Sequence, residues 1–293
     1  MTGPRWLVLG GSGLLGAPLV ERLQAIGLDV WAPTRTQLDA TDTTAVRDLV
    51  ATARPTVVVN AAAFTDVDGS ETQRHLAEAT NAEAVRTLVE TCGIARTRLV
   101  HISSASVLTG GRKVVMNEET PLKPLNWYNQ TKAAGESYCS AAIAVGADIA
   151  VARTYWLYGR GRPNFTDFVA SQLLTGATVN VVFDQWGQPT YTEDVVDAIL
   201  ALGSASDARG IFHVVNSGAA SRLDWALRIA DLLNRPRSLV NAVSASDFAA
   251  PAERPESCIL EDTRLVDLGV TMRSWQAALT DYVETIYGGN AHA

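Results

Sequence analysis

A glycine-rich turn at residues 10–16, Gly-Gly-Ser-Gly-Leu-Leu-Gly, follows an apolar run and opens onto a helical pattern. Glycines at this spacing allow a tight turn and let the backbone approach a pyrophosphate, whose charge then faces the helix N-terminus. A purely structural turn is the alternative, but the position between strand and helix strengthens the motif. The turn therefore predicts a dinucleotide-binding βα unit. Its expected cofactor contacts are Gly10, Ser12, Gly13, Leu14 and Gly16.

Apolar runs and helical patterns alternate over the first 155 residues. The strand-like runs are Trp6–Leu9, Leu28–Ala32, Thr56–Asn60, Leu99–Ile102 and Ile149–Ala152. The helical patterns between them cover 14–26, 43–53, 81–92 and 127–145. Strands that alternate with helices predict an α/β fold of the Rossmann type, in which helices cover both faces of a doubly wound parallel sheet.

The alternation loosens after Gly159, where glycine and proline interrupt the chain at 159–163 and 187–189. Strand-like runs remain at Val179–Phe183 and Ile211–Val215, and helical patterns at 192–203, 221–233 and 273–286. We expect a smaller C-terminal substrate lobe interleaved with the sheet. The predicted division assigns 1–155, with late sheet elements near 190–233, to the cofactor domain, and 156–189 and 234–290 to the lobe.

Composition excludes several classes of function. The net charge of −7 leaves no basic stripe for nucleic acid, and no apolar run approaches the roughly 18 residues that a membrane helix needs. Three scattered cysteines, Cys92, Cys139 and Cys258, form neither a zinc motif nor a disulfide framework and suit a reducing compartment. We expect a cytoplasmic protein that acts on a small molecule.

Tyr128 and Lys132 form a Tyr-x-x-x-Lys pair in a chain with seven tyrosines and only three lysines. The spacing places both side chains on one helix face. With Ser104 upstream and the dinucleotide turn before it, the pair indicates a nicotinamide-dependent oxidoreductase. Tyr128 would donate a proton to a substrate carbonyl as hydride arrives, Ser104 would hydrogen-bond the same oxygen, and Lys132 would hold the nicotinamide ribose.

A phenol with a pKa near 10 is poorly matched to neutral chemistry. We expect Lys132 and the positively charged oxidised nicotinamide to lower the pKa of Tyr128 by about 2–3 units. The alternatives are a surface aromatic for Tyr128 and a solvated charge for Lys132. Ser103 and Ser106 are neighbouring alternatives to Ser104.

The segment 31–36 after the second strand-like run contains one arginine, Arg35, and no acid. Arginine there can accept the 2′-phosphate of NADP, so NADPH is favoured and NADH remains possible, because Arg35 could also be an ordinary loop residue. Asp39 could touch the adenine, and Asp42 is expected to cap a helix. Small residues after the third run would let the cofactor lie against the sheet edge or let a helix pack closely. These residues are Ala61, Ala62 and Ala63.

Longer segments resemble a known family. They are GGSGLLG, VVVNAAAFTDVD at 57–68, TNAEAV at 80–85, NEETPLKPLNWYNQTKAAGE at 117–136, RTYWLYG at 153–159, DQWGQPTYTEDV at 184–195 and RPESCIL at 254–260. The chain is similar to extended short-chain dehydrogenases/reductases, and within them to dTDP-4-dehydrorhamnose reductases, which reduce a dTDP-linked 4-keto-6-deoxyhexose. The resemblance implies that Trp156 packs on the sugar, and it allows a homodimer. It also implies nucleotide contacts from Asn164, Phe165, Gln185 and Arg254.

One segment departs from that family. Where its members carry Ser-Thr-Asp-Tyr-Val-Phe-Asp-Gly, this chain has Ser-Ser-Ala-Ser-Val-Leu-Thr-Gly at 103–110. Ser104 keeps a hydroxyl, but Ala105 and Ser106 replace two polar side chains expected near the sugar. Because unpaired polar groups discriminate strongly between substrates, we expect a modified 4-ketohexose of secondary metabolism, as in antibiotic deoxysugar biosynthesis. The acidic residues that some members use for magnesium are absent, with leucine at position 15, so no metal is expected.

Two other functions stay open. A nucleotide-sugar dehydratase or epimerase would use the same Tyr/Lys pair with a retained cofactor, although dehydratases usually carry Asp-Glu beside the catalytic hydroxyl, where this chain has Ala105-Ser106. A non-catalytic, cofactor-binding regulatory subunit would tolerate the changes at 105–106, but intact Ser104, Tyr128 and Lys132 argue against it.

Overall fold

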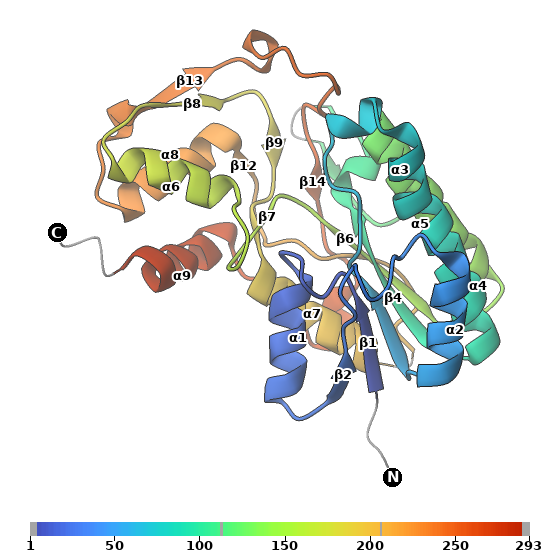
Figure 1. Cartoon of the computed structure of the whole chain (residues 1–293). Coiled ribbons are helices and arrows are strands. Elements are labelled where there is room, and N and C mark those ends of the chain that lie inside the picture. Colours follow the sequence, from blue (N-terminus) through green and yellow to red (C-terminus); the bar gives the residue numbers. More distant parts are fainter. Residues whose placement is uncertain (1–4, 112–113, 206, 289–293) are drawn as a thin grey trace.

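The computed structural model describes residues 5–111, 114–205 and 207–288. A parallel sheet of six strands lies at the centre of the larger part, with the order β2-β1-β3-β4-β6-β11 (Figure 1). Its strands are β1 (Arg5–Leu9), β2 (Asp29–Trp31), β3 (Val57–Asn60), β4 (Arg98–Ser104), β6 (Ile149–Thr154) and β11 (Gly210–His213). The predicted Rossmann-type α/β fold is confirmed.

Helices cover both faces of this sheet because side chains alternate along its strands. Trp6 and Val8 of β1 point to the face packed by α1 (Gly16–Ala25) and α7 (Thr192–Ser204). Leu7 and Leu9 point to the other face, where α2 (Thr43–Ala53), α4 (Ala84–Ala95) and α5 (Trp127–Ala144) pack. A short helix, α3 (Arg74–Glu78), and a π-helical turn at Ala79–Glu83 precede α4.

A smaller lobe has its own apolar core and lies beside the carboxyl end of the sheet (Figure 1). It contains α6 (Phe165–Leu174), α8 (Arg222–Leu232), α9 (Trp275–Tyr287) and the parallel pair β8 (Val179–Val182) and β13 (Val240–Val243). Short paired strands complete the described strands. They are β5 (Val115–Met116) with β14 (Ile259–Leu260), β7 (Leu157–Tyr158) with β10 (Thr190–Tyr191), and β9 (Trp186–Gly187) with β12 (Ala220–Ser221).

The two cores assign some segments differently from the expected division. Helix α8, which we grouped with the late sheet elements, buries Trp225 and Ile229 in the core of the smaller lobe. Leu265 and Met272, grouped with the lobe, pack in the core of the sheet. We therefore propose that α7, β11 and the segment around 265–272 complete the cofactor domain. The outer ends of the expected division, residues 1–4 and 289–290, lie outside the described residues.

The strand order places a topological switch point beside β1, which has β2 on one side and β3 on the other. Open α/β sheets bind ligands in the crevice outside the carboxyl ends of the strands at such a point. The smaller lobe faces this edge of the sheet (Figure 1). The fold therefore places the turn at 10–16 and the end of β4 in one crevice.

The remaining global predictions concern thiols and the membrane. All three cysteines are buried and free, as expected from their spacing. Within the described ranges, no helix combines the length and apolarity that crossing a membrane requires.

Candidate active site

A cavity of about 770 Å³ lies at the carboxyl ends of the strands, between the sheet and the smaller lobe. Most of the predicted site residues line it, namely Gly10, Ser12, Gly13, Leu14, Arg35, Asp39, Ala61, Ala62, Ala63, Ser104, Tyr128, Lys132, Trp156 and Arg254. The predicted residues absent from its lining are Gly16, Asn164, Phe165 and Gln185. The structure thus gathers residues from positions 10 to 254 around one space large enough for a sizeable ligand.

The glycine-rich turn has the geometry of a phosphate cradle. Gly10 has a φ of +77°, and a Cβ added there would lie 2.7 Å from the carbonyl carbon of Ala61. A Cβ on Gly16 would overlap the carbonyl oxygen of Gly10, so Gly16 permits close packing of the turn although it does not line the cavity. The first turn of α1 carries no acidic residue that would repel an anion. These residues fit a dinucleotide diphosphate.

Two residues after β2 lie at the expected adenosine end of the cavity. Arg35 is exposed, and within the described chain its guanidinium makes no hydrogen bond or ion pair. Asp39 accepts hydrogen bonds from the amide and the hydroxyl of Thr41 at 2.9 and 2.8 Å. These bonds lower the pKa of Asp39 against a smaller opposing effect of burial. The prediction that Asp42 caps a helix is confirmed, because its carboxylate accepts from the Ala45 amide at 3.0 Å at the start of α2.

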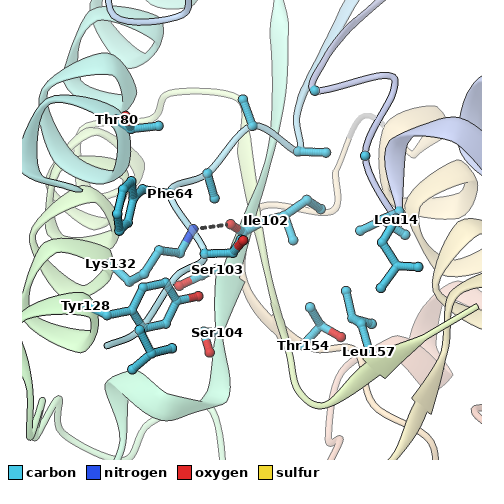
Figure 2. Close-up of a pocket in the computed structure, with 18 of the residues that line it drawn as sticks. Leu14, Phe64, Thr80, Ile102, Ser103, Ser104, Tyr128, Lys132, Thr154 and Leu157 are labelled. Carbon is cyan, nitrogen blue, oxygen red and sulfur yellow. Dashed lines mark hydrogen bonds between the residues drawn. The ribbon is translucent and has the colours of Figure 1, made fainter. Parts of the chain in front are cut away.

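Helix α5 carries the Tyr-x-x-x-Lys pair. Its cap is Asn126, whose side chain accepts from the Asn129 amide at 2.9 Å and donates to the Glu253 carbonyl at 2.7 Å. The cap therefore fixes the start of the helix and ties it to the 252–254 segment. Tyr128 and Lys132 follow one turn apart and point toward the end of β4 (Figure 2).

Lys132 is 2% exposed. Its ammonium donates to the Ile102 carbonyl at 2.7 Å (Figure 2). Burial lowers its pKa to about 8, and the charge of Glu136, one turn further along α5, acts in the opposite direction. Glu136 is itself held by the Ser103 hydroxyl at 2.8 Å and by Arg153. Lys132 is thus a constrained cation rather than a solvated surface charge.

The expected lowering of the Tyr128 pKa is wrong for the chain by itself. Burial raises the pKa of the phenol to about 12, and interaction with the Ser104 hydroxyl lowers it only in part. The Lys132 ammonium is directed to the Ile102 carbonyl instead. A phenol in this site is a proton donor rather than a phenolate at neutral pH.

Ser104 and Ser106 share a hydrogen bond between their hydroxyl oxygens at 2.8 Å, and the Ser106 amide donates to the Ser104 oxygen at 3.2 Å. Both serines line the cavity. Ala105 is different: it is completely buried in an apolar cluster with Val107 and Cys258. The expectation that both 105 and 106 remove polar groups near the sugar is therefore corrected, because only position 106 faces the cavity.

The predicted substrate residues divide into two groups. Trp156 and Arg254 line the cavity. Trp156 has a φ of +42°, a strained value for a non-glycine residue, and stacks between Tyr155 and Trp225 with ring centroids at 5.2 and 5.9 Å. Arg254 forms two bonds to Asp68, at 3.0 and 2.8 Å.

The other group has structural roles in the described chain. Asn164 caps α6 by accepting from the amides of Thr166 and Asp167. Phe165 packs on Trp225 with ring centroids 4.6 Å apart. Gln185 accepts a backbone bond from the Arg222 amide at 3.2 Å. None of these three residues lines the cavity.

The lining residues that the sequence interpretation did not assign to the site include Thr154, Arg162 and Arg222. The hydroxyl of Thr154 is buried without a hydrogen-bond partner in the described structure, and β-sheet register pairs Thr154 with Ser104. That register could have indicated Thr154, because neighbouring parallel strands end at the same sheet edge. Arg162 donates to the Ser12 carbonyl at 3.0 Å. Arg222 lies outside every motif and could be found only from the packing.

Residues 4–287 match the family described as RmlD substrate binding domain. The chain is 39% identical to a dTDP-4-dehydrorhamnose reductase of Streptomyces griseus, over 97% of this chain and 95% of that protein. It is 37% identical to a probable dTDP-4,6-dihydroxy-2-methyloxan-3-one 4-ketoreductase of Streptomyces antibioticus, over 94% of each. A crystal structure of dTDP-4-dehydrorhamnose reductase from Bacillus anthracis in complex with NADP superposes with a TM-score of 0.90 at 31% identity, covering 96% and 99% of the two chains.

Proposed function

The chain belongs to the RmlD substrate binding domain family, and from that membership we propose that it uses NADPH to reduce the 4-keto group of a dTDP-linked 4-keto-6-deoxyhexose. The observation that carries the proposal is the convergence of Ser104, Tyr128 and Lys132 on one wall of the cavity, which the glycine-rich turn also lines (Figure 2). The relatives named as dTDP-sugar ketoreductases match over nearly the whole chain, so both lobes are included in the comparison.

The cofactor would lie along the sheet edge. The turn from Gly10 to Gly13 and the first amides of α1 would hold its diphosphate, and Ala61 and Ala62 leave space beside the turn. Arg35 would bind the 2′-phosphate, which supports NADPH over NADH. When bound, the reduced nicotinamide supplies the hydride for the ketone.

Tyr128 would donate its proton to the carbonyl oxygen of the sugar. The raised pKa keeps the phenol protonated before the reaction, so the proton is available when negative charge develops on the oxygen. Ser104 would donate a second hydrogen bond to that oxygen, and its bond to Ser106 restricts the orientation of its hydroxyl. Lys132 would hold the cofactor ribose and place a positive charge next to the reacting groups.

The sugar itself is proposed to be a modified 4-ketohexose of secondary metabolism. Ser106 supports this proposal, because it lines the cavity at the position where the resembling family has tyrosine. Its hydroxyl is hydrogen-bonded to that of Ser104. A serine leaves more room and presents a shorter polar group. A substrate with a different substituent or pose would fit this space better than one that requires a tyrosine hydroxyl.

The direct test is consumption of NADPH by the purified protein with dTDP-4-keto-6-deoxyglucose, in the presence and absence of a 3,5-epimerase. We expect loss of NADPH absorbance together with a dTDP-linked 4-hydroxy sugar, and the epimerase dependence will report the C3 and C5 configuration. A dehydratase or epimerase would change the sugar without net consumption of NADPH. Tight NADPH binding without turnover of any dTDP-linked keto sugar would contradict the proposal and favour a regulatory subunit.

A further inference from the structure

The cavity is positively charged although the chain carries a net charge of −7. Its cationic lining residues are Arg35, Lys132, Arg162, Arg222 and Arg254, whereas Asp39 is the acidic residue among the described lining. Such a concentration of cations on an acidic protein marks a site for anions. A dinucleotide and a nucleotide sugar together bring several phosphates into one cavity, so different cations must serve different phosphates.

Several of these cations are already engaged. Asp68 holds Arg254 through two bonds, at 3.0 and 2.8 Å. Lys132 donates to the Ile102 carbonyl, and Arg162 donates to the Ser12 carbonyl in the glycine-rich turn. Arg162 and Arg35 therefore belong to the cofactor end of the cavity.

Arg222 is held by aromatic rings instead. Its guanidinium carbon lies 4.4 Å from the centroid of the Trp156 ring and 5.0 Å from that of Phe165. Stacking uses the faces of the guanidinium and leaves the N–H groups in its plane available as donors. Throughout the described ranges, no carboxylate lies within ion-pair distance of it, and its side chain makes no hydrogen bond. The side chain is partly buried and lines the cavity.

We propose that Arg222 binds the diphosphate of the nucleotide sugar and thereby determines that the substrate is a nucleoside-diphosphate sugar. The inference rests on the proposed function and adds a residue to it. Arg222 begins α8 of the smaller lobe and stacks on Trp156, whereas the cradle for the cofactor diphosphate follows β1 of the sheet. A planar guanidinium matches two phosphate oxygens at once, and a bound diphosphate would neutralise a charge that has no ion-pair partner among the described residues.

The burial of Arg222 is a second observation that supports this assignment. It lowers the pKa of Arg222, and the nearby charge of Arg254 lowers it further, while Tyr155 acts in the opposite direction. An arginine remains charged in proteins, so the protein keeps a cation here at an energetic cost. A ligand that supplies negative charge would offset that cost in the bound state.

The test measures binding and not turnover. Calorimetry of the NADP⁺-loaded protein gives the affinities for dTDP and for thymidine in the wild type, Arg222→Met, Arg222→Lys and a control, Arg228→Met. Arg228 lies on the same helix and donates to Thr280, so its replacement removes the same charge outside the cavity. Methionine at 222 preserves apolar contact with Trp156, and thermal unfolding verifies that each variant is folded.

We expect Arg222→Met to lower the affinity for dTDP by about tenfold to a hundredfold, as for loss of charged hydrogen bonds. Arg222→Lys should show an intermediate loss of affinity. Thymidine and NADPH affinities should stay at the wild-type values, as should dTDP affinity in Arg228→Met. Unchanged dTDP affinity in Arg222→Met, equal losses for dTDP and thymidine, or a loss confined to NADPH would overturn the inference and leave the reductase intact. Failure of the wild type to bind dTDP would overturn the inference and the dTDP-sugar assignment together.

Discussion

The ammonium nitrogen of Lys132 lies 2.7 Å from the carbonyl oxygen of Ile102, and the residue is 2% exposed. Helix α5 therefore carries this cation into the protein and fixes it against the backbone of β4. Burial lowers the pKa of this ammonium to about 8, from 10.5 in an unstructured chain, against the opposing charge of Glu136. The burial of Lys132 therefore affects both the proposed chemistry and the pH dependence of the unfolding free energy.

The first prediction concerns the pH dependence of folding. Between about pH 8 and pH 10 the unfolded chain binds a proton at Lys132 that the folded chain does not, so Lys132 contributes a rise of the unfolding free energy with pH. The buried thiols of Cys92, Cys139 and Cys258, whose pKa burial raises to about 12, contribute a fall over the same window. Above about pH 10, Tyr128 acts in reverse, because its folded pKa is raised. Urea unfolding of Lys132→Met should therefore show a steeper fall of the unfolding free energy between pH 8 and pH 10 than the wild type, whereas replacing the exposed Lys123 should preserve the wild-type pH dependence. An equal pH dependence of the unfolding free energy in the two variants would argue against a lowered pKa for Lys132.

The second prediction separates backbone strain from the cofactor cradle. Gly10 and Gly27 have nearly the same φ, +77° and +78°, but an added Cβ meets the backbone of Ala61 only at Gly10. Gly27→Ala should lose about 1 kcal/mol of unfolding free energy from strain alone, and should bind NADPH normally. Gly10→Ala should lose more stability and should bind NADPH weakly, as measured by fluorescence titration. Normal NADPH binding by Gly10→Ala would show that the turn is not the cradle.

The third prediction concerns the choice of cofactor. Arg35 is exposed at the cavity and its guanidinium has no side-chain partner among the described residues. Loss of a charged contact to the 2′-phosphate should cost about 1.5–3 kcal/mol. Arg35→Ala should therefore lower the affinity for NADPH by about tenfold or more, while the affinity for NADH stays the same. Parallel losses for the two cofactors would indicate that Arg35 does not contact the 2′-phosphate.

The fourth prediction follows from the burial of Ala105. Its neighbours are apolar, so Ala105→Asp would place a carboxyl group in a cluster that offers no partner from Val107 or Cys258. We expect a loss of at least about 2 kcal/mol in unfolding free energy, without any gain of activity on dTDP-4-dehydrorhamnose. Ala51→Asp, at an exposed position of α2, is the matched control and should be nearly neutral. A stable and more active Ala105→Asp would restore the idea that position 105 contacts the sugar.

The fold was largely accessible from the sequence because its signals are local. The valine run at 57–59 and the turn at 10–16 indicate a buried parallel strand and a βα junction without knowledge of the rest. The place of α8 depends on contacts that are not local. Its amphipathic pattern shows that one face is buried, but only the packing shows that Trp225 lies in the core of the smaller lobe.

The site was predictable where a motif carries its own geometry. Tyr128 and Lys132 share a helix face by spacing alone, and both line the cavity. The pKa of Tyr128 was not predictable, because it depends on burial and on where the Lys132 ammonium points. Arg222 had no sequence signal, since its contacts with Trp156 and Phe165 join residues 57 or more positions apart.

The central claim is that Tyr128 transfers a proton to the ketone oxygen. Its most direct test is the single-turnover rate of NADPH oxidation by Tyr128→Phe, with the NADPH affinity measured on the same protein. Tyr138→Phe is the matched control, because Tyr138 lies on the same helix and its hydroxyl donates to Glu83 at 3.3 Å. We expect Tyr128→Phe to lose about 10²- to 10⁴-fold in rate at unchanged NADPH affinity, and Tyr138→Phe to behave as wild type. A rate for Tyr128→Phe within a few-fold of wild type would contradict the assignment of Tyr128 as the proton donor.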